Sequence, residues 1–127
     1  MKNFAPHDQF LKFKKKNLTY CRIYPTITFM SWKVDATVDF EKWFKKQDKR
    51  IRNRIDLRVV MISEEGHFGW YKPLGDGVYE LKWKNENLRV YYCFKGKTIL
   101  LLLNGGSKSG QSKDIQKAKK LKEKLCG

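Results

Sequence analysis

The chain has 127 residues, which corresponds to one domain of ordinary size. Its hydrophobic fraction of 41% and aromatic fraction of 14% exclude a generally disordered protein, and its 9 glycines and 3 prolines exclude collagen-like and low-complexity chains. Lys and Arg number 28 against 13 Asp and Glu, and the formal net charge of +15 predicts a polyanionic partner: nucleic acid, an anionic membrane or an acidic protein. The charge does not choose among these partners, and a basic protein without such a partner also stays open.

The first 29 residues differ from the rest of the chain. They combine a run of three lysines, two prolines and scattered aromatic residues without a sustained period of 3.6 or 2. Better patterning begins at Met30. We therefore treat residues 1–29 as an N-terminal extension and 30–127 as a single domain, and we expect a chain that starts at Met30 to fold and keep its activity.

Residues 31–64 predict a short strand followed by two helices. Ser31 to Val34 favours a strand, Thr37 an N-cap, and Asp48 a break between two helices that end at Gly66. The result is a helical hairpin over about residues 37 to 64. Its apolar residues recur at roughly helical spacing: Phe40, Trp43, Phe44, Ile51, Ile55 and Ile62. Its expected exterior is basic: Lys45, Lys46, Lys49, Arg50, Arg52, Arg54 and Arg58.

From Gly75 the apolar period changes to 2, which predicts an antiparallel meander. Its strands are Val78 to Trp83, Leu88 to Phe94 and Thr98 to Leu103, and the last is apolar on both faces and therefore central. Gly105-Gly106 is expected to break this strand. A final Lys-rich helix follows, with the apolar stripe Ile115, Ala118, Leu121 and Leu125. The predicted fold is α+β, with an N-terminal helical hairpin packed on one face of an antiparallel sheet and a C-terminal helix.

Alternation along the strands sorts their side chains onto two faces. The apolar set can pack under the hairpin: Tyr79, Leu81, Trp83, Leu88, Val90, Tyr92 and Phe94. Lys82, Arg89 and Tyr91 are then expected together on the uncovered face. Cations beside an aromatic ring suit RNA, which offers phosphates and bases that stack. An ordinary solvated sheet face explains the same pattern equally well.

Several other classes of protein and site find no support in the sequence. The longest wholly apolar run, Ile99 to Leu103, is far shorter than the ~20 residues of a membrane span, so we expect a cytoplasmic protein. Cys21, Cys93 and Cys126 are interpreted as ordinary thiols, without paired ligands for zinc. No P-loop is present either, and we expect neither metal nor cofactor. Cys93 is interpreted as a small packing residue.

A set of polar side chains remains for chemistry on RNA: Lys72, Lys82, Arg89, Tyr91, Lys108 and His67. The 2′-OH of RNA can attack the adjacent phosphate, and a protein accelerates this by holding the geometry and offsetting charge on the phosphorane. A lysine whose pKa is lowered by neighbouring cations could act as the base. His67 is a candidate acid or base, although a loop histidine more often only contacts solvent.

Three stretches carry a resemblance to a known family: FEKWFKKQDKRIRNRI, EEGHFGWYKPLGDGVYELKW and LRVYYCFKGKTILLLLNGGSKSGQSKDIQKA. In this order and spacing they resemble the phage-derived Gp49-like / HigB group of addiction-module toxins, within the RelE/ParE toxin superfamily, from about Ser31 to Leu125. The resemblance implies a compact α+β toxin that a cognate antitoxin silences. Members similar to RelE and HigB cleave mRNA on the translating ribosome, whereas ParE-like members poison DNA gyrase.

The resemblance also implies roles for particular residues. In RelE-like toxins basic residues on the open sheet face act on the RNA, and they correspond here to Arg89, Lys82 and, with a different loop length, Lys108. Most of the group have Asp where Ser107 stands, Thr where Gly110 stands and commonly Arg in place of Lys82. These departures concern the site rather than the family, and they leave room for a weakly active or inactive copy.

Three functions therefore stay open. The leading one is a type II toxin that acts as a ribosome-dependent endoribonuclease, with Arg89 as its most important side chain and Lys72, Tyr91 and His67 as substrate-binding residues. The others are a gyrase-binding toxin that cleaves nothing and an inactive basic RNA-binding relic. The expected partners are the ribosome with its mRNA and a small acidic antitoxin with a helix-turn-helix, in an assembly that can be a heterotetramer. Complementary charge on such an antitoxin would also speed association.

Overall fold

The computed structural model describes residues 32–84 and 86–126, so the predicted N-terminal extension and Met30 lie outside the described residues. The division at residue 30 thus stays a prediction. The elements, in chain order, are β1 (Lys33–Ala36), α2 (Val38–Lys45), α3 (Lys49–Glu65), β2 (Tyr71–Gly75), β3 (Val78–Lys82), β4 (Arg89–Lys95), β5 (Ile99–Gly106), the short 3-10 segment η1 (Lys108–Gly110) and α4 (Gln111–Cys126). The α+β class is confirmed, and no helix of the described residues has the length and hydrophobicity to cross a membrane.

The five strands form a mixed sheet in the order β1-β5-β4-β3-β2. The neighbouring pairs from β2 to β5 are antiparallel, as predicted, but β1 runs parallel to β5, with Val34 opposite Leu100. The expectation of a purely antiparallel sheet is therefore wrong. β5 lies inside the sheet, as its two apolar faces predicted. It continues through Gly105-Gly106, which were expected to break it.

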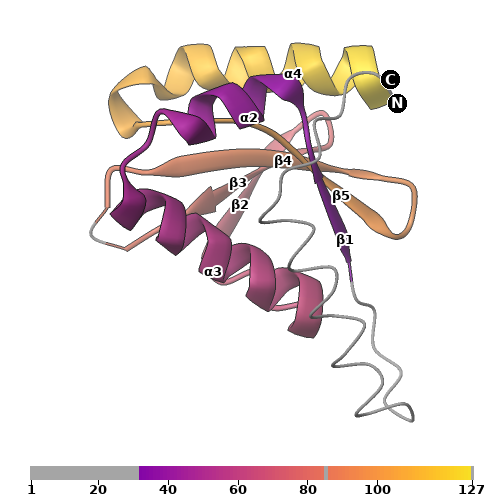
Figure 1. Cartoon of the computed structure of the whole chain (residues 1–127). Helices are drawn as coiled ribbons and strands as arrows, with labels where there is room; N and C mark the ends of the chain where they lie inside the picture. The colour runs from indigo at the N-terminus through magenta and orange to yellow at the C-terminus, as the bar shows by residue number, and fades with distance from the viewer. Residues whose placement is uncertain (1–31, 85, 127) are drawn as a thin grey trace, which may run out of the picture.

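The helix boundaries follow local signals that the sequence displays. The Thr37 hydroxyl accepts the Phe40 amide at 3.0 Å, so the predicted cap is confirmed. Asp48, predicted as the break between the helices, also caps α3: its carboxylate accepts the Ile51 amide at 2.9 Å. Gly66 ends α3 in the left-handed conformation, with φ of 68°. The two helices diverge after this break (Figure 1), with α2 lying beside α4, so the expected hairpin arrangement is not confirmed.

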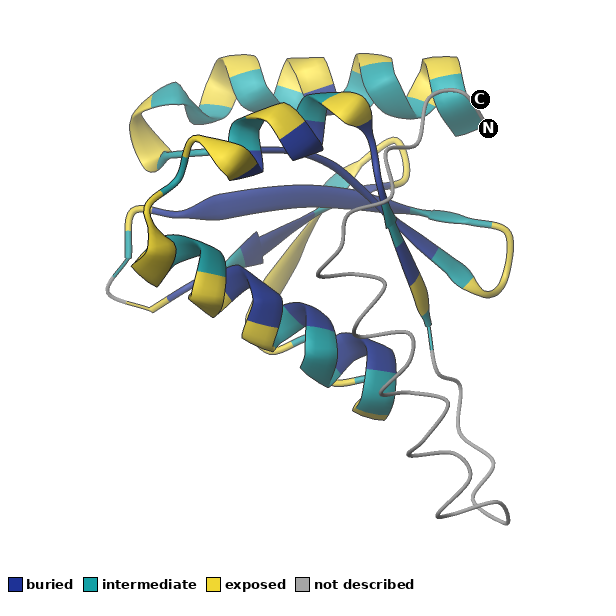
Figure 2. Ribbon diagram, viewed as in Figure 1, coloured by how far each residue is buried: buried dark blue, intermediate teal, exposed yellow. Residues whose placement is uncertain are grey.

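Each face of the sheet has its own hydrophobic cluster. On one face, residues of α2 and α3 pack over the predicted apolar set, with Phe40, Ile55 and Ile62 fully buried. On the other face, α4 covers Tyr91, Cys93 and neighbouring leucines through its predicted stripe. Burial on both sides is visible in the dark blue strands between the helices (Figure 2). The sheet therefore lacks the open face that the sequence interpretation assigned to it.

Asp56 is a buried carboxylate on α3 and supplies a test of the packing. Its Oδ1 has no hydrogen-bond partner in the structure, and burial raises its pKa from 3.8 to about 6, against a smaller opposing effect of Arg52. A raised pKa means that folding favours the protonated acid. The ionised carboxylate therefore destabilises the fold above about pH 6, and this cost vanishes below about pH 4.

We expect Asp56→Asn to raise Tm at pH 8 by several degrees and to leave it nearly unchanged at pH 4, since 1 kcal/mol shifts Tm by about 4–8 °C in a domain of this size. Thermal unfolding by circular dichroism at both pH values measures this. Asp76→Asn makes the same chemical change at an exposed turn residue and serves as the control. A gain in Tm that is equal at both pH values would contradict a raised pKa of Asp56.

Candidate functional site

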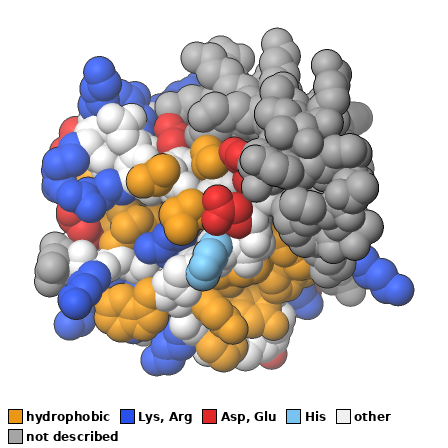
Figure 3. All heavy atoms as spheres, turned by 90° about the horizontal axis from the view of Figure 1, so that it is seen from below, with side chains coloured by type: hydrophobic (Ala, Val, Ile, Leu, Met, Phe, Trp, Pro, Cys, Tyr) orange, Lys and Arg blue, Asp and Glu red, His pale blue; other side chains and the backbone are white. Residues whose placement is uncertain are grey.

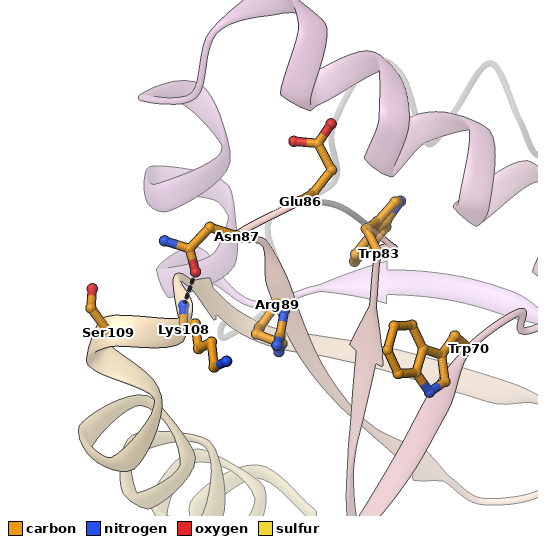
Figure 4. Close-up of a pocket in the computed structure, with 7 residues that line it drawn as sticks. All are labelled: Trp70, Trp83, Glu86, Asn87, Arg89, Lys108 and Ser109. Carbon is orange, nitrogen blue, oxygen red and sulfur yellow. Dashed lines mark hydrogen bonds between the residues drawn. The ribbon is translucent and has the colours of Figure 1, made fainter.

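A shallow pocket of about 640 Å³ lies at the end of the sheet where β3 ends and β4 begins (Figure 4). Four stretches of chain meet there: the residue before β2, the β3–β4 connection, the start of β4 and η1. The lining residues are Trp70, Trp83, Glu86, Asn87, Arg89, Lys108 and Ser109. Two cations, two indole rings, one carboxylate and two short polar groups thus surround one concave surface. The cations and rings suit an anionic ligand that also has a flat ring.

Arg89 is held in this pocket by a buried carboxylate. The first residue of β4, it is only 8% exposed, and its Nε lies 3.8 Å from Oε2 of Glu80, which is fully buried. Gln111, at the start of α4, donates to the same carboxylate oxygen at 2.5 Å. The Arg89 Nη1 donates to the Leu88 carbonyl at 2.9 Å. The guanidinium is therefore positioned by an ion pair with β3 and by a hydrogen bond to the preceding residue, and it keeps a small accessible part toward the pocket.

Lys82 and Trp70 form a pair at the edge of the pocket. Lys82 lies directly opposite Arg89 in the β3–β4 register, so the predicted neighbourhood of these two cations is confirmed. Its Nζ lies 4.7 Å from the centre of the Trp70 ring, at cation–π distance. Trp70 is 54% exposed, an unusual exposure for an indole, and its ring is thus both accessible and positioned by a cation.

Arg58 on α3 positions the tryptophan-bearing segments. Its Nη1 donates to the Phe68 carbonyl at 3.1 Å, its Nη2 donates to the Lys82 carbonyl at 2.9 Å, and its guanidinium lies 4.2 Å from the Trp83 ring centre. Burial lowers the pKa of this guanidinium. The expectation that Arg58 belongs to a solvated basic exterior is wrong, because these three contacts draw it inward.

The β3–β4 connection is fixed from both sides. The Lys108 amide donates to Oδ1 of Asn87 at 2.7 Å, which joins η1 to this connection. Glu86 turns toward α3, where Arg50 at 2.6 Å and Arg54 at 3.1 Å bind its Oε2 (Figure 4). The Lys108 side chain remains exposed. It is therefore the most accessible cation among the residues that line the pocket.

The structure separates the six predicted site residues. Arg89 and Lys108 line the pocket, and Lys82 borders it. Lys72 is exposed on β2, opposite Glu80, and His67 is exposed in the loop before β2. Neither Lys72 nor His67 lines the pocket. Tyr91 is fully buried under α4, and its hydroxyl has no hydrogen-bond partner in the structure. Burial, with smaller effects of Glu80 and Asp114, raises its pKa. The expectation that Tyr91 lies on an uncovered face is therefore wrong.

Sequence reasoning missed Trp70, Trp83 and the β3–β4 connection as parts of the site. Trp83 was assigned to the apolar face, and it does belong to that cluster, but β3 ends one residue earlier and the indole also reaches the pocket. Trp70 precedes a strand that was not predicted. The sequence offered one signal for Trp70, because it directly follows Gly69, and this glycine adopts positive φ in the structure. Seen from the α3 side, the surface mixes hydrophobic side chains with Lys and Arg (Figure 3).

The described residues contain no group of three or more His, Cys, Asp or Glu side chains that could hold a metal ion. The arrangement can neutralise phosphate charge through Arg89 and Lys108, and it can offer Trp70 for stacking.

Comparison with known proteins gives two matches. The family model described as "Phage derived protein Gp49-like" matches residues 42–123. An uncharacterized protein of Haemophilus influenzae (strain ATCC 51907 / DSM 11121 / KW20 / Rd) is 34% identical over 98 residues, which cover 76% of this chain and 98% of that protein. No solved structure matches this chain.

Proposed function

The chain belongs to the phage-derived Gp49-like family, and from this premise we propose that it is the toxin of a type II toxin–antitoxin module and a member of the RelE/ParE superfamily. We propose further that it is an endoribonuclease that cuts mRNA on the ribosome in the cytoplasm. A small acidic antitoxin would bind and silence it. The family membership is compatible with a toxin, and the pocket supplies the support for RNA as the target.

The observation that carries the proposal is the convergence of Arg89, Lys108 and the exposed Trp70 on one pocket. RNA is recognised in single strands by cations on the backbone and by aromatic rings under unstacked bases. A formal charge of +15 also raises the rate of encounter with a polyanion. A site for an uncharged ligand would need neither the two cations in the pocket nor the large net charge.

The pocket favours cleavage that uses the RNA's own nucleophile. The 2′-oxygen attacks the adjacent phosphorus, the bond from phosphorus to the 5′-oxygen breaks, and the products are a 2′,3′-cyclic phosphate and a 5′-hydroxyl. Arg89 and Lys108 would offset charge on the phosphorane, and the Lys108 ammonium would protonate the leaving oxygen. Glu86 is engaged by two arginines and is therefore not assigned the base, so the 2′-OH proton passes to water.

Expression from an inducible promoter, with mapping of new RNA 5′ ends, tests the proposal. We expect growth arrest together with cuts inside translated codons. Growth arrest with intact mRNA and a DNA-damage response would favour the gyrase-binding alternative, and normal growth would favour an inactive relic. Cuts that persist when translation is blocked would contradict the dependence on the ribosome.

Trp70→Ala tests the stacking role. We expect it to weaken binding of single-stranded RNA by about 10-fold or more, because a base stacked on an aromatic ring contributes about 1–3 kcal/mol. Fluorescence anisotropy with a labelled oligonucleotide measures the affinity. Tyr71→Ala is the matched control, since Tyr71 is 51% exposed but contacts Phe68 on the other face of the sheet. Equal losses in the two variants would contradict a specific role for Trp70.

A further inference from the structure

Two thiols that are distant in sequence meet on the face of the sheet that α4 covers. Cys93 lies in the middle of β4 and is fully buried, and Cys126 is the last residue of α4. Their Sγ atoms are 3.7 Å apart, and both cysteines are free. The sequence interpretation assigned Cys93 to packing and did not anticipate this contact, since neither the spacing nor a CxxC motif signals it.

The contact is close to the geometry of a disulfide. An S–S bond is about 2.05 Å long, so the two sulfur atoms need to approach by less than 2 Å. Cys93 is fixed in a central strand, whereas Cys126 occupies the final turn of a helix, the part of a helix in which small displacements disturb the fewest hydrogen bonds. The approach can therefore come from the helix side.

The two thiols differ in their readiness to react. Burial, together with the neighbouring Cys126 thiol, raises the pKa of Cys93 to about 12, against smaller opposing effects of Lys122 and Lys95. Cys93 thus remains a thiol at neutral pH. Cys126 is only half-buried and is the sulfur that a small solute can reach first. When an accessible thiol lies beside a buried one, an oxidant reaches the accessible thiol and converts it to a sulfenic acid. The buried thiol then attacks that sulfur, and a disulfide forms.

We propose that Cys93 and Cys126 form an oxidation site that a peroxide converts into a disulfide. The Cys126 sulfur attacks one peroxide oxygen, the O–O bond breaks, and a sulfenic acid and one water form. The Cys93 sulfur then attacks the Cys126 sulfur, the S–O bond breaks, and a second water leaves. The two thiols lose two protons and two electrons in total, and hydrogen peroxide is reduced to two molecules of water.

The bond would join the end of α4 to the centre of the sheet. At its other end the same helix contributes Gln111, which binds Glu80 and thereby supports Arg89. The bond would also close a loop from residue 93 to residue 126, and a disulfide that closes such a loop restricts the unfolded chain. Oxidation is therefore expected to hold α4 more firmly against the sheet beside Glu80. This inference stands whether or not the chain cleaves RNA.

The experiment uses the full chain and a Cys21→Ser variant of it, each treated with a small excess of hydrogen peroxide. We expect a loss of two thiols per molecule, a mass decrease of two hydrogens, and a tryptic peptide pair that joins Cys93 to Cys126. We also expect Tm to rise by about 10 °C and to return after reduction with dithiothreitol. Cys126→Ser is the matched control, and its Cys93 should stay reduced because it is buried.

Three results would overturn the proposal. The first is a chain that keeps both thiols under conditions that oxidise free cysteine. The second is oxidation of Cys126 to the sulfinic acid without formation of the bond. The third is a bond to Cys21 in place of the one between Cys93 and Cys126.

Discussion

Arg89→Ala is expected to abolish growth arrest and to lower RNA cleavage by about 100-fold or more. Arg89 provides the one guanidinium among the residues that line the pocket. In the proposed mechanism, a preorganised cation beside the scissile phosphate would be the largest contribution of this site. Quantitative 5′-end mapping after induction measures the loss. Lys97→Ala removes an equal charge from an exposed turn residue outside the pocket and is the control.

The same substitution also affects stability, because Arg89 contacts a fully buried carboxylate. The sequence interpretation placed Arg89 on an uncovered face of the sheet, and that part is wrong, because Arg89 is buried against Glu80. Without the guanidinium, Glu80 retains only its bond from Gln111 among the contacts of the described residues. A cost of about 1–3 kcal/mol follows from leaving a buried polar group unpaired. Loss of activity in Arg89→Ala alone would therefore mix two causes.

A double variant, Glu80→Gln with Arg89→Gln, separates these causes. It replaces the buried charges by a neutral pair that can still form hydrogen bonds, so Tm should lie close to that of the wild type while cleavage remains lost. Each single variant should unfold at a lower temperature than the double one, since each leaves one charge uncompensated. A stable double variant that still cleaves RNA would refute the assignment of Arg89.

Gly105→Ala is expected to destabilise the fold by about 1–3 kcal/mol, the usual cost of forcing an extra methyl group into a packed contact. A Cβ at Gly105 would overlap the six-membered ring of Trp43, which packs from α2 onto this end of β5. The glycine is therefore required by close approach, although the sequence interpretation expected it to break the strand. Chemical denaturation gives the free energy of unfolding.

Trp43 provides the control for this prediction. In a Trp43→Leu background the ring is gone, so adding Gly105→Ala should cost much less than it does in the wild type. Gly96→Ala is a second control, because no atom of residues 32–84 and 86–126 lies within 4 Å of a Cβ there, while the φ of 69° opposes the change. If Gly105→Ala cost the same with and without the Trp43 ring, steric overlap would not be its cause.

The sequence predicted those features that depend on neighbouring residues. Thr37, Asp48 and Gly66 mark helix ends through hydrogen bonds and φ values that involve only nearby backbone. The edge strand β2 was missed because Pro73 and its exposed side chains lack the alternation of a half-buried strand. Local signals therefore located most elements, and a strand without local signals was lost.

The open face was predicted wrongly for a different reason. The apolar stripe of α4 was identified correctly, but its partner surface was not, and only tertiary structure shows that it covers Tyr91 and Cys93. The two apolar faces of β5 already required a cover on each side. The pairing of Lys82 with Arg89 was predictable, because the alternation of apolar and polar residues along the two strands places both side chains on the same face. The Arg58 contacts were not predictable, because they join segments that no periodic pattern relates.

The parallel pairing of β1 with β5 determines when the sheet can be completed during synthesis. Val34 meets Leu100, and the Thr37 hydroxyl donates to the Leu103 carbonyl, 66 residues later in the chain. The strands from β2 to β5 are connected by short turns and can assemble from consecutive segments as they leave the ribosome, because local contacts close quickly. The first described strand, by contrast, has to wait for the last one. The apolar side of α2 stays without its β5 partner until residue 106 has left the ribosome, so the sheet is completed only after every segment between β1 and β5 has been synthesised.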